Sequence, residues 1–146
     1  MSFFLRRSPG VVATPDPSAA AVVNARDRSA PRILVVDDDP DVRAFMVETL
    51  VALGYRVDSA AGGRAALHMM ASDPPDLLVL DFAMPHLDGA KVAKLARSQG
   101  LQMPIVFASG YADSSALDAA MGTNISLLRK PFSIGNLSAV VAAALA

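Results

Sequence analysis

The stretch that decides the fold is Leu77-Leu78-Val79-Leu80-Asp81, which is followed by Phe82-Ala83-Met84-Pro85 and then by Asp88-Gly89. A short apolar run closed by turn residues is typical of a strand buried on both faces. A carboxylate at the carboxyl end of such a strand lies at the sheet edge where open α/β proteins bind ligands. Asp81 is therefore either an acceptor or catalytic carboxylate, or a residue that ends a strand and begins a turn.

Similar apolar runs recur on both sides of this stretch and alternate with segments of helical spacing. The runs that we predict to be strands are 33–36, 55–59, 77–81, 103–108 and 125–128. The segments that we predict to be helices are 42–53, 64–71, 90–97, 115–121 and a last helix after Ser133. Strand and helix thus alternate five times, which predicts an α/β fold with a doubly wound, five-stranded parallel sheet of the flavodoxin-like (βα)5 type.

The residues that flank these segments favour the predicted helix ends. Asp39 before Pro40 suits an N-cap, and Gly54 suits the position just after a helix. Asp88 and Ser133 are expected to cap the third and the last helix. On the last helix, the side chains that we expect on one face are those of Ile134, Leu137, Val141 and Leu145.

The first 31 residues differ from the rest of the chain. They contain four prolines and lack apolar periodicity. Such a segment buries too little apolar surface to offset the entropy lost on ordering, so we expect 1–31 to be a disordered N-terminal arm. We expect 32–146 to form one folded domain.

Composition excludes several classes of protein. The chain has no cysteine, which rules out disulfides and thiol chemistry and fits a cytoplasmic location. A net charge of −1 lacks the basic balance of a nucleic-acid binder. No apolar stretch approaches the roughly 18–20 residues of a membrane span.

Polar side chains occupy the carboxyl ends of four predicted strands. Asp37 and Asp38 end the first strand, Asp81 ends the third, Ser109 ends the fourth and Lys130 follows the fifth. Because the carboxyl ends of parallel strands share one edge, we expect these side chains to converge in space.

This set of side chains favours a particular chemistry. Three clustered carboxylates repel one another unless a positive charge offsets them, and Mg²⁺ prefers carboxylate oxygens. Lys130 adds a second positive charge and Ser109 a hydroxyl donor, which together would neutralise the oxygens of a phosphoryl group. Because an Asp carboxylate can form an acyl phosphate, we predict Mg²⁺-assisted phosphorylation of one Asp.

Four motifs from about Pro31 to Ala146 resemble the receiver domain of two-component response regulators, including chemotaxis regulators. The motifs are Ile33-Leu34-Val35-Val36-Asp37-Asp38-Asp39-Pro40, Leu77-Leu78-Val79-Leu80-Asp81 with Met84-Pro85 and Asp88-Gly89, Pro104-Ile105-Val106-Phe107-Ala108-Ser109-Gly110, and Lys130-Pro131-Phe132. They occur in the family's order and at its spacing, and they cover the whole predicted domain.

The resemblance implies a role for each matching residue. Asp81 resembles the phospho-acceptor, and Asp37 and Asp38 resemble the acidic pair that holds Mg²⁺, with Asp38 as a direct ligand. Asp81 and the backbone carbonyl of Ala83 would complete the protein ligands of the metal.

Two more residues gain roles in the same way. Ser109 resembles the hydroxyl that moves toward the phosphoryl group, and Lys130 resembles the lysine that pairs with it. The Lys130–Pro131 bond is typically cis in this family.

The function implied is that of a phosphorelay receiver. Its partner would be a histidine kinase or a histidine phosphotransfer protein, whose phosphohistidine would supply the phosphoryl group, and its phosphorylation would switch contacts with a downstream protein. The chain would be no enzyme beyond its own phosphorylation and slow self-dephosphorylation. Since it ends at the last helix, we expect a single-domain regulator, a phosphate sink or shuttle, or a receiver detached from a hybrid kinase.

Three positions depart from the family pattern or bear on the lifetime of the phosphoryl group. The family often has an aromatic residue at the position of Leu127, so its usual route of signal transmission is in doubt. Ala83 and Tyr111 would flank the path of the hydrolytic water, and neither Ala83 nor a bulky Tyr111 would help that water. We therefore expect slow self-dephosphorylation, which decay of the phosphoprotein in Ala83→Asn and Tyr111→Ala would test.

Two other functions compete with this one. A phosphatase of the haloacid dehalogenase type would need a second Asp two residues after the nucleophile, where this chain has Ala83. A receiver-like adaptor that works without phosphorylation would have no need of the intact set of charged residues.

Two interpretations are open for the surface formed by the last helix and Leu127. It either only packs on the sheet, or it forms a homodimer or partner surface. His68 and His86 are expected to face solvent.

Overall fold

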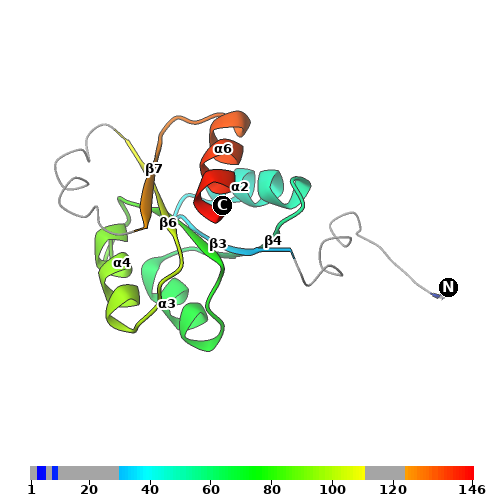
Figure 1. The fold of residues 1–146 in the computed structure, drawn as a ribbon, viewed down its shortest axis with the longest axis horizontal. Coiled ribbons are helices and arrows are strands. Elements are labelled where there is room, and N and C mark those ends of the chain that lie inside the picture. Colours follow the sequence, from blue (N-terminus) through cyan, green and yellow to red (C-terminus); the bar gives the residue numbers. More distant parts are fainter. Residues whose placement is uncertain (1–2, 6–7, 10–29, 111–123) are drawn as a thin grey trace.

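The computed structural model describes residues 3–5, 8–9, 30–110 and 124–146 (Figure 1). Its strands in the main sheet are β3 (Arg32–Val36), β4 (Arg56–Ala60), β5 (Leu77–Asp81), β6 (Ile105–Ser109) and β7 (Ile125–Arg129). Its helices are α2 (Pro40–Ala52), α3 (Gly63–Ser72), α4 (Gly89–Ser98) and α6 (Ile134–Leu145).

The five strands form one parallel sheet in the order β4-β3-β5-β6-β7. The chain runs from β3 outward to β4 and then crosses back to β5 on the other side of β3. The strand order therefore reverses between β3 and β5, which is where doubly wound sheets bind their ligands. The predicted doubly wound (βα)5 sheet is confirmed.

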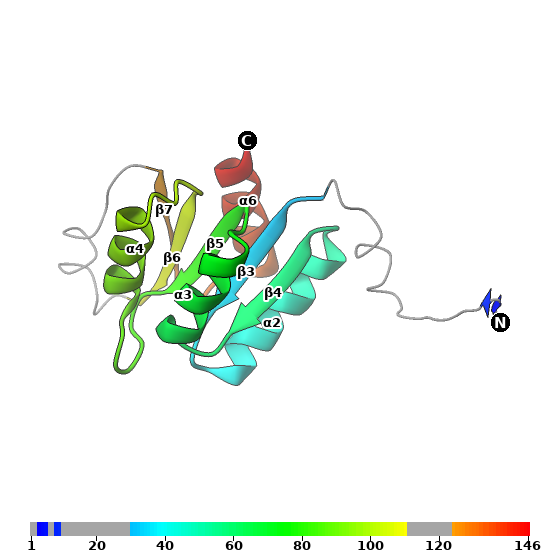
Figure 2. The same cartoon turned by 90° about the horizontal axis from the view of Figure 1, so that it is seen from below.

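Helices cover the sheet on both faces (Figure 2). Helices α3 and α4 pack on one face, and α2 and α6 pack on the other. The three central strands are sandwiched between these layers, so every residue of β5 and β6 is buried. This burial explains why Leu77–Asp81 reads as a continuous apolar run rather than an alternating one.

Side chains cap the helices as the sequence predicts. Asp39 accepts hydrogen bonds from the backbone N–H groups of Asp41 and Val42 at the start of α2. Asp88 accepts one from Lys91 at the start of α4. Ser133 caps α6 in a reciprocal capping box with Asn136.

Some element bounds differ from the predictions. Strand β6 begins at Ile105 rather than at Met103. In α6, Leu137 and Val141 are buried and Leu145 is half-buried, while Ile134, the first residue of the helix, is 56% exposed. The helix predicted for 115–121 and Tyr111 lie outside the described residues.

Contacts with the sheet include residues just before the predicted domain start at residue 32. Ala30 is buried, and its carbonyl accepts a hydrogen bond from the guanidinium of Arg56. Further toward the N-terminus, β1 (Phe3–Leu5) and β2 (Ser8–Pro9) pair antiparallel, a local pairing that we had not predicted. The disordered arm over the rest of 1–31 stays a prediction. None of the described helices is long and apolar enough to cross a membrane.

Candidate functional site

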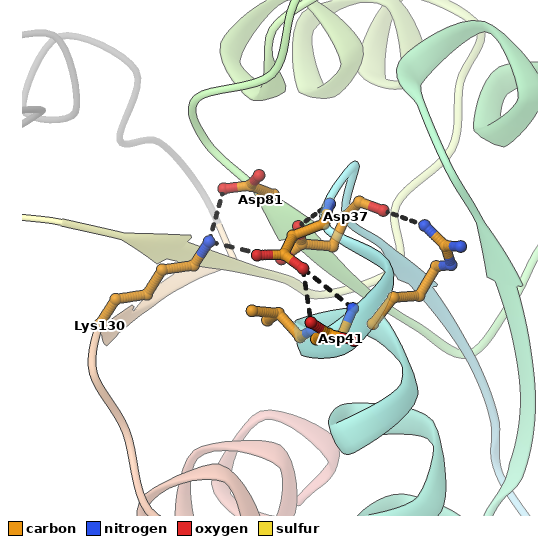
Figure 3. A network of polar contacts seen from close by, with 7 residues as sticks. Asp37, Asp41, Asp81 and Lys130 are labelled. Carbon is orange, nitrogen blue, oxygen red and sulfur yellow. Dashed lines mark hydrogen bonds and ion pairs between the residues drawn. The ribbon is translucent and has the colours of Figure 1, made fainter.

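Three of the predicted polar residues, Asp37, Asp81 and Lys130, lie together at the carboxyl edge of the sheet (Figure 3). Asp37 directly follows β3, and Asp81 is the last residue of β5, the strand beside it. Ser109 ends β6 and Lys130 follows β7. These residues meet where the strand order reverses, which is the place that the topology predicts for a site.

Three carboxylates form the acidic part of the site. One oxygen from each of Asp37, Asp38 and Asp81 lies within 4.8 Å of the other two. Asp37 and Asp81 are buried, whereas Asp38 is exposed. Convergent carboxylate oxygens with one open side are the donors that a hard divalent cation prefers, since Mg²⁺ keeps waters and takes a further ligand from the substrate. The residues present therefore fit Mg²⁺.

Lys130 reaches across the sheet edge to both buried carboxylates. Its Nζ lies 3.1 Å from Oδ1 of Asp81 and 3.4 Å from Oδ2 of Asp37. Among the described residues, one ammonium thus pairs with two of the three clustered carboxylates, so negative charge is in excess when all three are ionised. A bound divalent cation would balance that excess.

The two partners of the closer ion pair have shifted pKa values. Burial raises the pKa of Asp81 to about 7, and the charge of Asp37 adds to the rise, while the hydrogen bond and charge of Lys130 oppose it. Burial lowers the pKa of Lys130, but its hydrogen bonds and charge pairing with Asp81 and Asp37 outweigh that effect, so the net shift is upward. Lys130 therefore stays cationic, and Asp81 titrates near neutrality when no metal is bound.

Ser109 lies beside this cluster on the neighbouring strand. Its side chain is buried and its hydroxyl donates to the carbonyl of Gly110 at 3.0 Å. Its own carbonyl accepts a hydrogen bond from the backbone N–H of Lys130 at 2.8 Å. That backbone contact joins the end of β6 to the start of the Lys130 loop, where the Lys130–Pro131 peptide is cis as the family resemblance implies.

The loop after Asp81 is held close to the strand end. The side chain of Ala83 is exposed, and Phe82 stacks edge-on against Phe107 with ring centroids 5.3 Å apart. The backbone N–H of Gly89 donates to the carbonyl of Phe82 at 2.9 Å. A Cβ atom at Gly89 would lie 2.6 Å from the carbonyl oxygen of Asp81, so only glycine fits where α4 begins.

Arg43 is a residue of the site that sequence reasoning missed. It lies in the first turns of α2, and its Nη1 donates to the backbone carbonyl of Asp37 at 2.8 Å. The available signal was its place in the chain, six residues after Asp37 and near a helix N-terminus. A cation there opposes the helix dipole unless a specific contact compensates.

Several other predictions concern residues near the site. His68 and His86 are exposed, as expected. Asp88 is a helix cap. Leu127 pairs in register with Phe107 of β6 and is half-buried against the core on the α3 and α4 side. The aromatic ring in this part of the sheet is thus the fully buried Phe107 rather than a side chain on β7.

Comparison with known proteins places this geometry in a family. The family model described as the response regulator receiver domain matches residues 33–142. The chain is 34% identical over 115 residues to Regulatory protein AtoC of Escherichia coli (strain K12), which covers 78% of this chain and 25% of AtoC. It is 43% identical over 109 residues to Response regulator MprA of Mycobacterium avium (strain 104), which covers 74% of this chain and 48% of MprA. The chain thus spans about a quarter to about half the length of these curated relatives.

Solved structures show the same likeness. The receiver domain of Hybrid Histidine Kinase CckA superposes with a TM-score of 0.68 at 35% identity, covering 79% of this chain and 99% of that one. The Vibrio cholerae chemotaxis protein CheY4 superposes with a TM-score of 0.71 at 27% identity, covering 80% of this chain and 99% of CheY4. With its fold, its site and these relatives in agreement, the chain belongs to the response regulator receiver domain family of two-component systems.

Proposed function

We propose that the chain receives a phosphoryl group on Asp81 from a phosphohistidine of a histidine kinase or a histidine phosphotransfer protein. The observation that carries this proposal is the placing of the buried Asp81 carboxylate among Asp37, Asp38 and Lys130. A buried carboxylate with a cation at 3.1 Å and two acidic neighbours is poorly explained as a strand terminator. It is well suited to accept a group that carries negative charge once the cations are in place.

The chemistry is an in-line transfer between two side chains. An oxygen of the Asp81 carboxylate bonds to phosphorus while the bond from phosphorus to the donor imidazole nitrogen breaks, and the imidazole keeps the electron pair and takes up a proton. Lys130 stays close enough to Asp81 to pair with a phosphoryl oxygen. Ser109 supplies a hydroxyl at the neighbouring strand end.

Mg²⁺ is the cofactor of the proposal. Asp37, Asp38, Asp81 and the backbone carbonyl of Ala83 would hold it, and it would supply positive charge that offsets the developing charge on the phosphoryl oxygens. The metal is also expected to draw Asp81 into its ionised form, because protonated Asp81 is a poor ligand and a poor nucleophile.

The output is a change in protein–protein contacts. The proposal covers a single-domain regulator, a phosphate sink or shuttle, and a receiver detached from a hybrid kinase. A cytoplasmic location belongs to the proposal because the phosphoryl group ultimately derives from ATP. Self-dephosphorylation is expected to be slow, since the exposed Ala83 has no polar side-chain atom to orient a water.

Intact-mass measurement after incubation with Mg²⁺ and acetyl phosphate tests the proposal. We expect a gain of one phosphate in the wild type, no gain in Asp81→Asn, and no gain when the metal is chelated. Asp88→Asn is a matched control, since Asp88 is a helix cap in the loop after the same strand. A phosphate gain in Asp81→Asn as large as in the wild type would contradict the assignment of the acceptor.

The alternative is an adaptor that works without phosphorylation. It predicts Mg²⁺ binding without any gain in mass, so the same experiment separates the two functions. The acidic pair Asp37 and Asp38, Ser109, and Lys130 paired with Asp81 argue against it, since an adaptor has no use for this set of side chains.

A further inference from the structure

We propose that Arg43 is a positioning residue that holds the metal-binding loop 37–39 in place through the backbone carbonyl of Asp37. The inference rests on the proposed function, because it concerns the Mg²⁺ site of that reaction. It assigns a task to a side chain that touches none of the three carboxylates in the described contacts.

Arg43 holds both ends of this short loop. Its guanidinium Nη1 donates to the carbonyl oxygen of Asp37 at 2.8 Å. Its backbone N–H donates to the carbonyl oxygen of Asp39 at 2.9 Å. The backbone contact is the first regular bond of α2, whereas the side-chain contact reaches back over the loop to the end of β3. Arg43 therefore joins the helix to the strand across the residues that would bind the metal.

The other contacts of the loop hold Asp37 and Asp39, so the orientation of Asp38 depends on these two neighbours. The buried Asp37 accepts a hydrogen bond from the backbone N–H of Asp39 at 2.9 Å and donates its own backbone N–H to Ala60 at 3.2 Å. Asp38 lies between these anchored residues and its side chain is exposed. Because the carbonyl of Asp37 and the nitrogen of Asp38 belong to one planar peptide unit, the guanidinium bond helps to set the direction in which Asp38 leaves the backbone.

The position of Arg43 near the start of α2 supports a directed contact. A cation in the first turns of a helix faces the positive end of the helix dipole, which is unfavourable. A guanidinium bond to a carbonyl is charge-assisted and fixed in geometry, and it compensates for that placement.

The charge of Arg43 and its positioning role predict opposite changes in Mg²⁺ affinity when the side chain is removed. If Arg43 acted only as a nearby positive charge, its removal would strengthen Mg²⁺ binding, because one repulsive charge would be gone. If it acts by holding the loop, its removal weakens Mg²⁺ binding, because Asp38 loses its fixed orientation. Residues that orient metal ligands typically change metal affinity by roughly 10- to 100-fold when they are replaced.

Isothermal titration calorimetry of Mg²⁺ binding to wild type, Arg43→Met and Arg43→Ala tests the proposal. We expect the Kd to rise about tenfold in both variants. Alanine is the best helix former, so Arg43→Ala serves if the methionine variant does not fold. An unchanged or lower Kd in the folded variant would overturn the proposal.

Arg56→Met is the matched control. Arg56 also donates from its guanidinium to a backbone carbonyl, that of Ala30 at 2.9 Å, but at the start of β4, the opposite end of the sheet from the site. We expect this variant to lose stability and to keep the wild-type Kd. A similar rise in Kd in Arg56→Met would show a general loss of stability and would also overturn the proposal.

Acetyl phosphate labelling provides a second readout, because a merely structural role would not change the Mg²⁺ requirement while leaving the maximal rate unchanged. In the Arg43 variants, the Mg²⁺ concentration for half-maximal labelling should rise about tenfold, while the rate at saturating Mg²⁺ stays within about twofold of wild type, because Asp81 and Lys130 are unchanged. Wild-type protein that bound no Mg²⁺ would overturn the proposed function as well, whereas normal wild-type binding with an unchanged variant Kd would overturn only the role of Arg43.

Discussion

Among the single residues that the structure describes, Asp81 has a raised pKa that makes stability depend on pH. Burial raises the pKa of its carboxyl from an ordinary 3.8 to about 7 in the folded protein. The folded protein therefore binds this proton more tightly than the unfolded chain, and the contribution of Asp81 to the free energy of unfolding falls as the pH rises from about 4 to about 7. At about 1.4 kcal/mol per pKa unit, the metal-free protein should lose up to roughly 4 kcal/mol of this contribution.

Urea unfolding of wild type and Asp81→Asn without divalent cations measures this effect. The neutral amide cannot titrate, so Asp81→Asn should gain stability relative to wild type between about pH 5 and about pH 8. Excess Mg²⁺ at the higher pH should stabilise wild type far more than the variant, since only the carboxylate binds the metal strongly. A difference between the two proteins that stayed constant with pH would contradict the raised pKa.

Lys130 is expected to affect stability and metal binding in opposite directions. Its Nζ is the cation that the structure places between Asp37 and Asp81, so Lys130→Met leaves buried carboxylates unpaired. We expect a loss of roughly 1–3 kcal/mol near pH 8 and a smaller loss near pH 5, where Asp81 is protonated. The same variant should bind Mg²⁺ more tightly but accept phosphate from acetyl phosphate at least about tenfold more slowly.

Lys94→Met is the matched control for this prediction. Lys94 is exposed on α4, so its removal should leave stability within about 0.5 kcal/mol and leave labelling unchanged. Equal losses in Lys130→Met at both pH values would show that its role is packing of the aliphatic stem rather than charge pairing.

Among the elements, the junction of β5 and α4 has the least room for change. A Cβ atom at Gly89 would lie 2.6 Å from the Asp81 carbonyl oxygen and 2.9 Å from Cα of Phe82, both backbone atoms that cannot rotate away. We expect Gly89→Ala to destabilise the protein by about 1–3 kcal/mol and to reduce labelling of Asp81 by displacing its loop.

The same substitution at Gly135 provides the comparison. A Cβ atom there meets only the hydroxyl of Ser133 at 3.7 Å, and Gly135 lies within α6. Gly135→Ala should therefore be neutral or stabilise by up to about 1 kcal/mol. Thermal unfolding of the two variants checks the pair, and a loss of stability in Gly135→Ala that matched the loss in Gly89→Ala would show that the backbone clash at Gly89 is not the cause of its loss.

The elements that the sequence predicts best are those whose residues are buried on two sides. Leu77–Asp81 is apolar because two helical layers cover it, and its bounds match the prediction. Local signals were also sufficient for the caps Asp39 and Asp88, which satisfy free backbone N–H groups. Helical spacing puts Ile134 on one face with Leu137, Val141 and Leu145, but it does not tell how deeply each side chain is buried, and Ile134 is exposed.

The residues of the site were predictable where topology alone brings them together. Asp37, Asp81, Ser109 and Lys130 each end or follow a strand, so a parallel sheet places them at one edge whatever the side-chain details. Arg43 was not predictable in this way, because its task depends on the direction of one guanidinium toward one carbonyl. Spacing along a chain does not encode that direction.

In the whole molecule, the two ends of the sheet have different tasks. The carboxyl edge holds closely spaced like charges, which is unfavourable without a cation. At the opposite edge, Arg32 makes a group of ion pairs and hydrogen bonds with Asp58, Asp73 and Asp76, which we call the clasp. Its guanidinium pairs with Asp58 at 2.7 Å and with Asp73 at 3.5 Å. Its backbone N–H also donates to the carboxylate of Asp76 at 2.8 Å. This clasp ties β3 to β4 and to the chain before β5, far from the site.

The clasp leads to a prediction about where the folded domain begins. The backbone N–H of Arg56 donates to the carbonyl of Pro31, and the guanidinium of Arg56 donates to the carbonyl of Ala30. Residues 30–32 therefore belong to the structured edge. A chain of residues 30–146 should have a free energy of unfolding within about 0.5 kcal/mol of the full chain, because the predicted arm buries little surface. A chain of residues 33–146 should lose roughly 3 kcal/mol or more, since several hydrogen bonds worth about 1 kcal/mol each disappear with the clasp.

Urea unfolding of the three chains measures these differences, and acetyl phosphate labelling in Mg²⁺ shows whether the site survives. The 30–146 chain should be labelled at the full rate, because it keeps both the contacts of Arg32 and the acceptor site. Arg32→Met in the full chain isolates the ion pairs from the backbone contacts and should account for only part of the loss in the shortest chain. If the 30–146 chain were instead as unstable as the 33–146 chain, the first 29 residues would have to pack on the domain, and the prediction of a disordered arm would be wrong.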